Sequence, residues 1–308
     1  MSTWPFGDYP DGGLVQLGPH VVAYHGDAPP VANSAIVRGA DATLVFDANT
    51  LRFARRLHEV AVAEGPPLRE LVISHAHDDH SFGAAYFAPP ARVHAHRATR
   101  DRMQRWLDEE PEGWLVEAYA DPAYYRGARD DARELRIVVP DVVVSERSVV
   151  DLGGGVRVHV VPLLERAHTK GDLWAYVEPD DVILCGDLWF TRCEPYLASG
   201  SVEGALRAVA DLRAAGGGVA LPGHGPPGRI PAEGEDEVER YCTWLIGTVA
   251  ELRETSDAED LVERARSRFE RERPVDFRVR IPGFFEENVR AAARDLERGP
   301  QGPSAGLG

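Results

Sequence analysis

The chain has 308 residues and a formal net charge of −16, from 50 acidic against 34 basic residues. This length can bury a substantial core and suggests about two domains, while the negative field repels phosphate backbones and disfavours nucleic acid as a partner. The three cysteines form no C-x-x-C pair, residues 1–13 carry no basic or apolar leader, and no later segment approaches the ~18 apolar residues of a membrane span. We therefore expect a cytoplasmic protein with no membrane partner.

The first part of the chain is predicted to form short strands followed by a helix. Apolar runs bounded by Gly, Pro and Asp predict strands at 14–17, 20–24, 34–38 and 43–47. From residue 50 to residue 64, apolar side chains recur at helical spacing, with Thr50 as a plausible N-cap. The run 71–74 returns to a strand pattern and leads directly into a histidine-rich segment.

A second cycle of the same kind follows. It contains predicted strands at 142–144, 149–151, 156–161, 173–177, 182–184 and 219–221, with a helix at about 202–215 before the last of them. The order sheet, helix, sheet, helix is typical of two packed sheets with helices outside. We predict a catalytic domain over residues 1–231. Helices at about 233–255, 257–271 and 285–298 form an extension over 232–298, which packs on that domain or builds a homodimer contact, and a disordered tail follows at 299–308.

Seven side chains of the metal-ligand type lie in short islands that follow apolar runs. Such a set has the size and chemistry for two metal ions, because a strand before each island would deliver it to a common edge. The alternative is a collection of unrelated polar residues in loops, which we assume for His20, His25, His58, His94, His96 and His159. The seven candidate ligands are His75, His77, Asp79, His80, His168, Asp187 and His224.

The spacing inside the first island has a physical reason. In an extended loop, His75 and His77 point to the same side and can reach one ion. A turn at residues 78–79 then directs Asp79 and His80 toward a second ion, while Asp78 itself is expected to be solvated. The three later candidates complete both sites, and a carboxylate is the natural ligand to bridge two cations.

These islands resemble those of the metallo-β-lactamase-fold superfamily over roughly residues 14–230. The matching features are H-x-H-x-D-H after a strand, His168-Thr169, Gly186-Asp187 and the loop Pro222-Gly223-His224-Gly225-Pro226. The resemblance implies an α/β fold, a four-layer αβ/βα sandwich with the metals at one rim. It also implies that the first ion is held by His75, His77 and His168, that the second is held by Asp79, His80 and His224, and that Asp187 bridges the two.

Within the superfamily, the set of His and Asp ligands is similar to that of hydroxyacylglutathione hydrolases and lactonases. It departs from many true β-lactamases, which use Cys or lack the bridging carboxylate, and this argues against antibiotic hydrolysis. We expect two Zn²⁺ per chain, although nitrogen and oxygen ligands also accept Fe or Mn. A hydroxide bridging the ions would then cleave a small-molecule thioester, lactone or ester, with Asp79 and Asp187 as the catalytic carboxylates.

Two other functions remain open. A sulfur (persulfide) dioxygenase with one iron at the first site resembles another branch of the superfamily, and a cyclase or other non-hydrolytic member of a biosynthetic pathway would keep the same fold. Metal content would separate the first of these from a hydrolase.

Several residues around the ligands are candidates for substrate contacts or for orienting the ligands. The segment 97–139 is longer than a simple connection needs and is either a substrate lid or a helical cover for a sheet; it carries Trp114 as a candidate pocket residue. Trp189 is either pocket wall or core. Thr169 and Asp172 either orient ligating imidazoles or shape a turn. Lys170 and the arginines of the 97–139 segment are candidate anchors for an anionic substrate tail.

Overall fold

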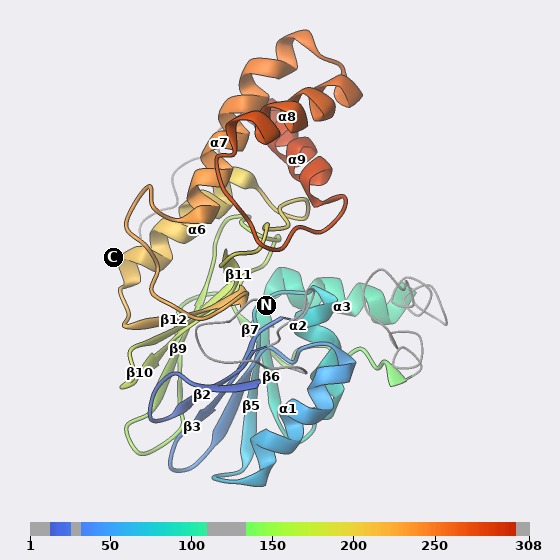
Figure 1. The fold of residues 1–308 in the computed structure, drawn as a ribbon. Coiled ribbons are helices and arrows are strands. Elements are labelled where there is room, and N and C mark those ends of the chain that lie inside the picture. The colour runs from blue at the N-terminus through green and yellow to red at the C-terminus, as the bar shows by residue number, and fades with distance from the viewer. Residues whose placement is uncertain (1–12, 26–31, 110–133, 300–308) are drawn as a thin grey trace.

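Two sheets lie face to face in the computed structural model, which describes residues 13–25, 32–109 and 134–299 (Figure 1). The first sheet has seven strands in sequence order, and its later pairs, from β4 to β7, are parallel. Its strands are β1 Gly13–Gln16, β2 Val21–His25, β3 Ser34–Arg38, β4 Thr43–Phe46, β5 Leu68–Ile73, β6 Arg92–His96 and β7 Val142–Val144.

The second sheet has five strands in the order β12-β11-β10-β9-β8. All its pairs are antiparallel except that of β11 with β12, which is parallel. Its strands are β8 Ser148–Asp151, β9 Arg157–Pro162, β10 Leu173–Glu178, β11 Val182–Phe190 and β12 Val219–His224.

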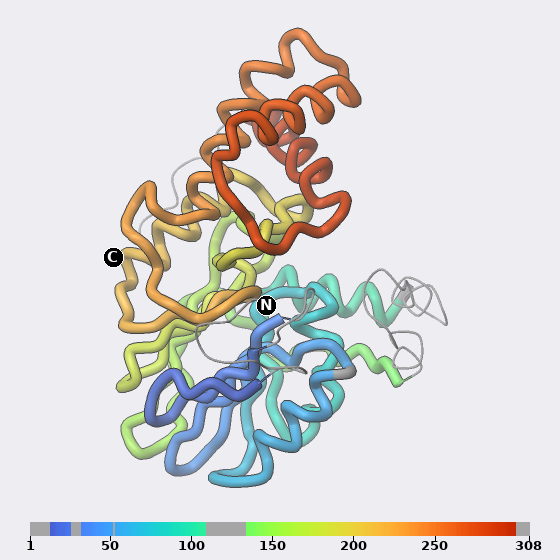
Figure 2. The backbone as a smooth tube through the Cα atoms, in the orientation of Figure 1, coloured from blue at the N-terminus to red at the C-terminus, as the bar shows by residue number. Residues whose placement is uncertain are grey.

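Helices cover the outer face of each sheet (Figures 1 and 2). The first sheet carries α1 Leu51–Ala63, α2 Asp78–Ser81, the 3₁₀ turn η1 Phe82–Tyr86 and α3 Arg97–Glu109. The second sheet carries α6 Val202–Ala215 and α7 Glu237–Leu252, and the remaining elements, η3 Arg253–Thr255, α8 Ala258–Glu272 and α9 Phe284–Arg298, pack against α7 beyond the end of the sheet.

Three hydrophobic clusters fill the spaces between these layers. In β3, Ala35 and Val37 face the second sheet, whereas Ile36 between them belongs to the cluster under α1. Because alternate side chains of a strand point to opposite faces, the first sheet is buried on both sides. A third cluster joins β11 to the helices from α6 to α9. The predicted four-layer αβ/βα sandwich is confirmed.

The C-terminal helices pack on the sandwich through this third cluster, which combines Trp189 of β11 with Leu245 of α7 and Val289 of α9. The alternative of a homodimer contact stays a prediction, as do the domain boundaries, and the predicted tail lies outside the described residues from 300 onward. None of the helices in the described ranges is long and apolar enough to cross a membrane.

Strand β6 was not predicted from the sequence, and β11 extends to Phe190, beyond the predicted strand at 182–184. The alternation in β6 places two histidines in a short run, and the buried His94 has its Nε2 2.7 Å from the Glu70 carboxylate on β5. His25, His58, His94, His96 and His159 are therefore not loop residues as we assumed, since four lie in strands and His58 lies in α1. Strand β11 continues past Asp187, with register shifts on both sides of Gly186.

Candidate metal centre

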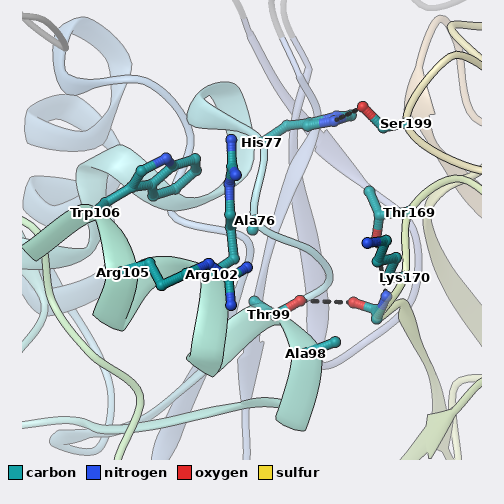
Figure 3. Close-up of a pocket in the computed structure, with 11 residues that line it drawn as sticks. Ala76, His77, Ala98, Thr99, Arg102, Arg105, Trp106, Thr169, Lys170 and Ser199 are labelled. Carbon is teal, nitrogen blue, oxygen red and sulfur yellow. Dashed lines mark hydrogen bonds between the residues drawn. The ribbon is translucent and has the colours of Figure 1, made fainter. Parts of the chain in front are cut away.

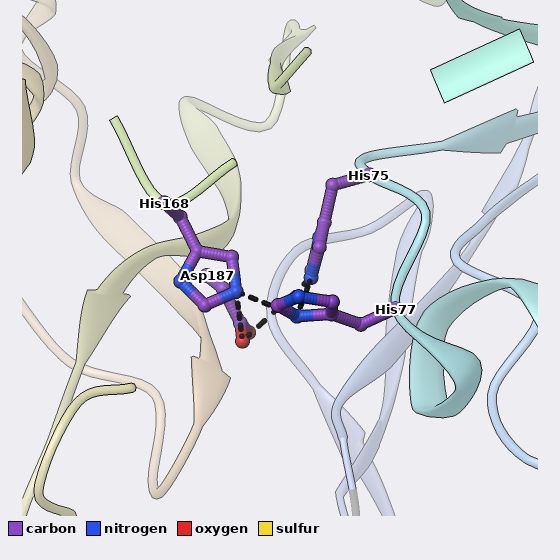
Figure 4. Close-up of side chains that lie close together, drawn as sticks. All are labelled: His75, His77, His168 and Asp187. Atoms are coloured by element: carbon purple, nitrogen blue, oxygen red, sulfur yellow. Dashed lines mark hydrogen bonds and ion pairs between the residues drawn. The ribbon is translucent and has the colours of Figure 1, made fainter. Parts of the chain in front are cut away.

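The first group of candidate ligands converges at the rim of the sandwich (Figure 4). His75 and His77 follow β5, His168 lies between β9 and β10, and Asp187 lies in β11. The Nδ1 atom of His77 is 3.0 Å from His75 Nε2 and 2.8 Å from His168 Nε2. The Oδ2 atom of Asp187 lies 3.1 Å from His168 Nε2 and 3.8 Å from His75 Nε2. Three ring nitrogens and one carboxylate oxygen thus face a common point, as ligands of one cation do.

The second group lies on the other side of Asp187. Asp79 and His80 lie in the short helix α2, and His224 ends β12. The Nε2 atom of His224 lies 3.2 Å from Asp79 Oδ2, and His80 Nε2 lies 3.8 Å from Asp79 Oδ1. The second carboxylate oxygen of Asp187, Oδ1, is 3.0 Å from His80 Nε2 and 3.5 Å from His224 Nε2. One carboxylate therefore directs one oxygen to each group.

Buried polar atoms at this point fit the binding of cations. His80 Nε2 and Asp187 Oδ1 are buried and lie 3.0 Å apart without the angles of a hydrogen bond, and neither atom has another hydrogen-bond partner among the described residues. Since a buried polar group without a partner is costly, a ligand is the expected complement. The donor set of imidazole nitrogens and carboxylate oxygens suits zinc, iron or manganese.

The pKa values of the histidines differ between the two groups. Burial, with crowding by His80 and His168, lowers the pKa of His75 well below its usual range, so this imidazole is neutral and has a lone pair to share. Burial alone would also lower the pKa of His224, but Asp187 and Asp79 raise it to about 10. Protons and metal ions therefore compete for the second group.

A buried carboxylate that the sequence analysis missed holds the second group in place. Asp47 Oδ2 lies 2.8 Å from His80 Nδ1 and also accepts the Ser74 hydroxyl at 2.8 Å. Ser74 Oγ in turn is 2.9 Å from His75 Nδ1. Partners of this kind fix the ring orientation and basicity of ligating histidines. The sequence signal for Asp47 was its place directly after the strand β4, at the same edge as the ligands.

The first group has a weaker partner. The free ring nitrogen of His77, Nε2, lies 3.2 Å from the hydroxyl of Ser199, and the Tyr196 ring lies 5.9 Å from the His77 ring. Both residues belong to the loop 191–201 between β11 and α6. Nothing in the sequence linked this loop to His77.

Helix α9 fixes the loop 191–201. The buried Asn288 side chain accepts the backbone N–H of Leu197 at 2.8 Å and donates to the carbonyl of Pro195 at 2.8 Å. The Asp295 carboxylate accepts the N–H of Val202 at 2.7 Å. The C-terminal helices therefore support the environment of a candidate ligand.

The His224 loop is shaped by contacts from both sheets. Asn33 donates to the carbonyls of Pro222 and Gly225 at 2.9 and 2.8 Å. The ring of Phe190 stacks on His224 at a centroid distance of 5.6 Å. At Gly223, a Cβ atom would come within 1.8 Å of Asp187 Oδ1, so this position accepts only glycine.

The other candidate residues have different environments. Trp189 is 1% exposed and donates its indole N–H to Asp236 at 2.7 Å, which favours the core over the pocket wall for this residue. Asp172 accepts the hydroxyl of Thr169 at 2.6 Å, whereas His168 Nδ1 has no hydrogen-bond partner among the described residues, which favours a role of Asp172 in shaping the turn. Asp78 is half-buried and not solvated as expected; burial and Asp79 raise its pKa to about 7. Trp114 lies outside the described residues, and the lid prediction for 97–139 stays a prediction because residues 110–133 of this segment also lie outside them.

Comparison with known proteins identifies the family. Residues 4–224 match the model of the metallo-beta-lactamase superfamily, and the chain belongs to this superfamily. With its His/Asp ligand set at the rim, it is a hydrolase of the metallo-β-lactamase fold. No curated protein sequence matches the chain.

Solved structures with low identity share the fold. The metallo-beta-lactamase from Pontibacter korlensis is 16% identical, with a TM-score of 0.53 over 71% of this chain and 94% of its own. The metallo-beta-lactamase from Erythrobacter litoralis is 15% identical, with a TM-score of 0.52 over 72% of this chain and 92% of its own. The stereoselective inverting sec-alkylsulfatase Pisa1 from Pseudomonas sp. is 16% identical, with a TM-score of 0.66 over 92% of this chain and 50% of its own.

Proposed function

We propose that the protein uses two divalent metal ions to hydrolyse an acyl bond of a small molecule, a thioester, lactone or carboxylic ester. The observation that carries this proposal is the position of Asp187, whose two oxygens face two separate groups of ligands. Two ions held this way would supply an activated water and polarise the substrate carbonyl. A similarity to hydroxyacylglutathione hydrolases and lactonases in the ligand set supports the acyl class.

The protein's own groups would have distinct tasks in this reaction. Asp187 would hold both ions and offset part of their charge. Asp79 lies at the half-exposed side of the second group, 3.2 Å from His224, where it can hold a cation and exchange a proton with the leaving group. The buried Asp47 keeps His80 oriented and remains behind the ligands.

Metal analysis together with a substrate panel tests the proposal. We expect about two ions per chain, because seven ligands exceed the three or four that one zinc ion needs. The panel contains a thioester, a lactone, an activated ester and a nucleic-acid phosphodiester. A secondary alkyl sulfate is added because one of the solved structures with a similar fold is that of a sec-alkylsulfatase. Phosphodiester cleavage without acyl hydrolysis would overturn the proposed substrate class.

A sulfur dioxygenase with one iron is the second candidate. The first group alone would suffice for it, with His75, His77, His168 and Asp187. The assembled second group favours the hydrolase, since a mononuclear enzyme has no use for it. Oxygen uptake with a persulfide substrate, by protein holding one iron per chain, would reverse this preference.

A further inference from the structure

A cavity of about 260 Å³ opens directly beside the first group of ligands. Figure 3 shows His77 at one end of it, the loop with Thr169 and Lys170 on one side, and α3 with Arg102 and Arg105 on the other. Since His77 is itself part of the wall, a molecule in this cavity lies against the candidate metal centre.

The charge of the cavity is opposite to that of the whole chain. Arg102, Arg105 and Lys170 line it, and no Asp or Glu does so among the described residues. Each of the three side chains is exposed, and none forms an ion pair with another described residue. In a chain with a net charge of −16, three cations that meet no carboxylate from the described part of the chain create a local site for an anion.

The two cationic walls are held at a fixed distance from each other. The hydroxyl of Thr99, on α3, donates to the carbonyl of Gly171 at 2.6 Å. A Cβ atom at Gly171 would lie within 2.5 Å of His96 Nδ1, so the loop approaches α3 as closely as it does because this residue is glycine. Lys170, the residue before it, is therefore presented to α3 by a rigid turn.

On the other wall, an aromatic ring supports Arg102. Its guanidinium carbon lies 5.0 Å from the centre of the Trp106 ring, and Figure 3 shows it standing between Trp106 and His77 in that view. The indole Nε1–H of Trp106 is buried and has no hydrogen-bond partner among the described residues. A guanidinium held against a ring presents its planar donors without first losing much side-chain freedom.

We propose that this cavity binds an oxyanion, a carboxylate or sulfate, at the non-reacting end of the substrate. Arg102 and Lys170 hold the anion from opposite walls and so place the acyl carbon at the metal centre. This inference rests on the proposed acyl hydrolysis. The volume is below the ~300–1,000 Å³ of pockets for drug-sized ligands, which suits a short chain with a charged end.

A matched pair of esters tests the proposal. The first is the mono-para-nitrophenyl ester of glutaric acid, which keeps one free carboxylate, and the second is the same ester with that carboxylate methylated. The measured quantity is the ratio of kcat/KM for the charged ester to kcat/KM for the neutral ester. In the variant Arg102→Gln with Lys170→Gln, we expect this ratio to fall by about 10- to 100-fold, mainly through KM, because charge-assisted hydrogen bonds are lost.

The control is Arg97→Gln. Arg97 is an exposed arginine on the same helix that does not line the cavity, so this variant also loses a positive charge but no contact. It should keep the wild-type ratio. An unchanged ratio in the double variant, or an equal loss in Arg97→Gln, would overturn the anion site.

Binding measurements separate this inference from the proposed function. Calorimetry would measure the affinity of the metal-loaded protein for glutarate and, as a second probe, for methyl sulfate. We expect tight binding of at least one of them to wild-type protein and to Arg97→Gln, with at least tenfold weaker binding to the double variant. If no ester is hydrolysed but this pattern is found, the acyl-hydrolysis proposal fails and the anion site stands. Equal binding to all three proteins would contradict the anion site whatever the activity.

Discussion

The two groups of candidate ligands differ in what holds them. His80 in the second group contacts a buried carboxylate, Asp47, which lies between β4 and α1 in the body of the sandwich. His77 in the first group contacts a hydroxyl, Ser199, on a loop that depends on α9. The second group is therefore built into the core, whereas one ligand of the first group depends on the C-terminal helices. We therefore expect that a substitution behind the second group lowers metal affinity more than one behind the first group.

Loss of a ligand should have the largest effect. His77→Ala removes one of three nitrogens from the first group, and we expect activity to fall by about 10³-fold or more because an ion contributes several kcal/mol to the reaction. Bound metal should drop toward one ion per chain, while the far-ultraviolet circular dichroism spectrum stays the same. Near-normal turnover with two ions retained would show that His77 is not a ligand.

A substitution at the shared carboxylate should affect both groups at once. Asp187→Asn keeps the shape and removes a charge that offsets two cations, so we expect metal affinity and turnover to fall by about 10- to 100-fold. Metal titration should show that both ions are weakened. If only one ion were affected, Asp187 would belong to one group alone.

Substitutions at Asp47 and Ser199, which contact the candidate ligands, test whether the two groups differ in their support. Asp47→Asn should lower metal affinity by about 10- to 100-fold, as for other carboxylates behind ligating histidines. Ser199→Ala removes one hydrogen bond between uncharged groups, worth about 0.5–1.5 kcal/mol, and should cost about 2- to 12-fold. Equal effects of the two substitutions would remove the proposed difference between the groups.

The smallest effect on activity is expected from α9. Asn288→Ala leaves the buried Leu197 N–H without a partner, at a cost of about 1–3 kcal/mol in the free energy of unfolding, and frees the loop that carries Ser199. We expect a Tm lower by several degrees and a change in turnover of only a few-fold. Arg290→Ala, at an exposed position of the same helix, is the control and should change neither quantity.

The sequence could predict which candidate ligands converge because much of their geometry is local. His75, His77, Asp79 and His80 are brought together by the spacing of one loop, and β12 delivers His224 to the same edge. The four-layer order of elements followed from the alternation of strand and helix patterns. These features depend on short stretches of chain and on strands whose ends meet at one edge of the sandwich.

The supporting residues could not be predicted in this way. Asp47 and His80 are 33 positions apart, and Leu197 and Asn288 are 91 apart, so no local pattern joins them. Trp189 shows a second limit. In a regular strand it would share the face of Asp187, but β11 shifts register between Gly186 and Phe190, and this turns Trp189 into the core and Phe190 toward His224.

The dependence of the loop 191–201 on α9 has a consequence for how the protein matures. Asn288 and Asp295 follow every candidate ligand in the sequence, so during synthesis they leave the ribosome after all of them. The sandwich can begin to fold, and β5, β11 and β12 can meet, while the support of His77 is still missing. A nascent chain that captures metal at this stage holds it before the first group is in final form, and α9, translated after every candidate ligand, then sets the geometry in which that ion is kept.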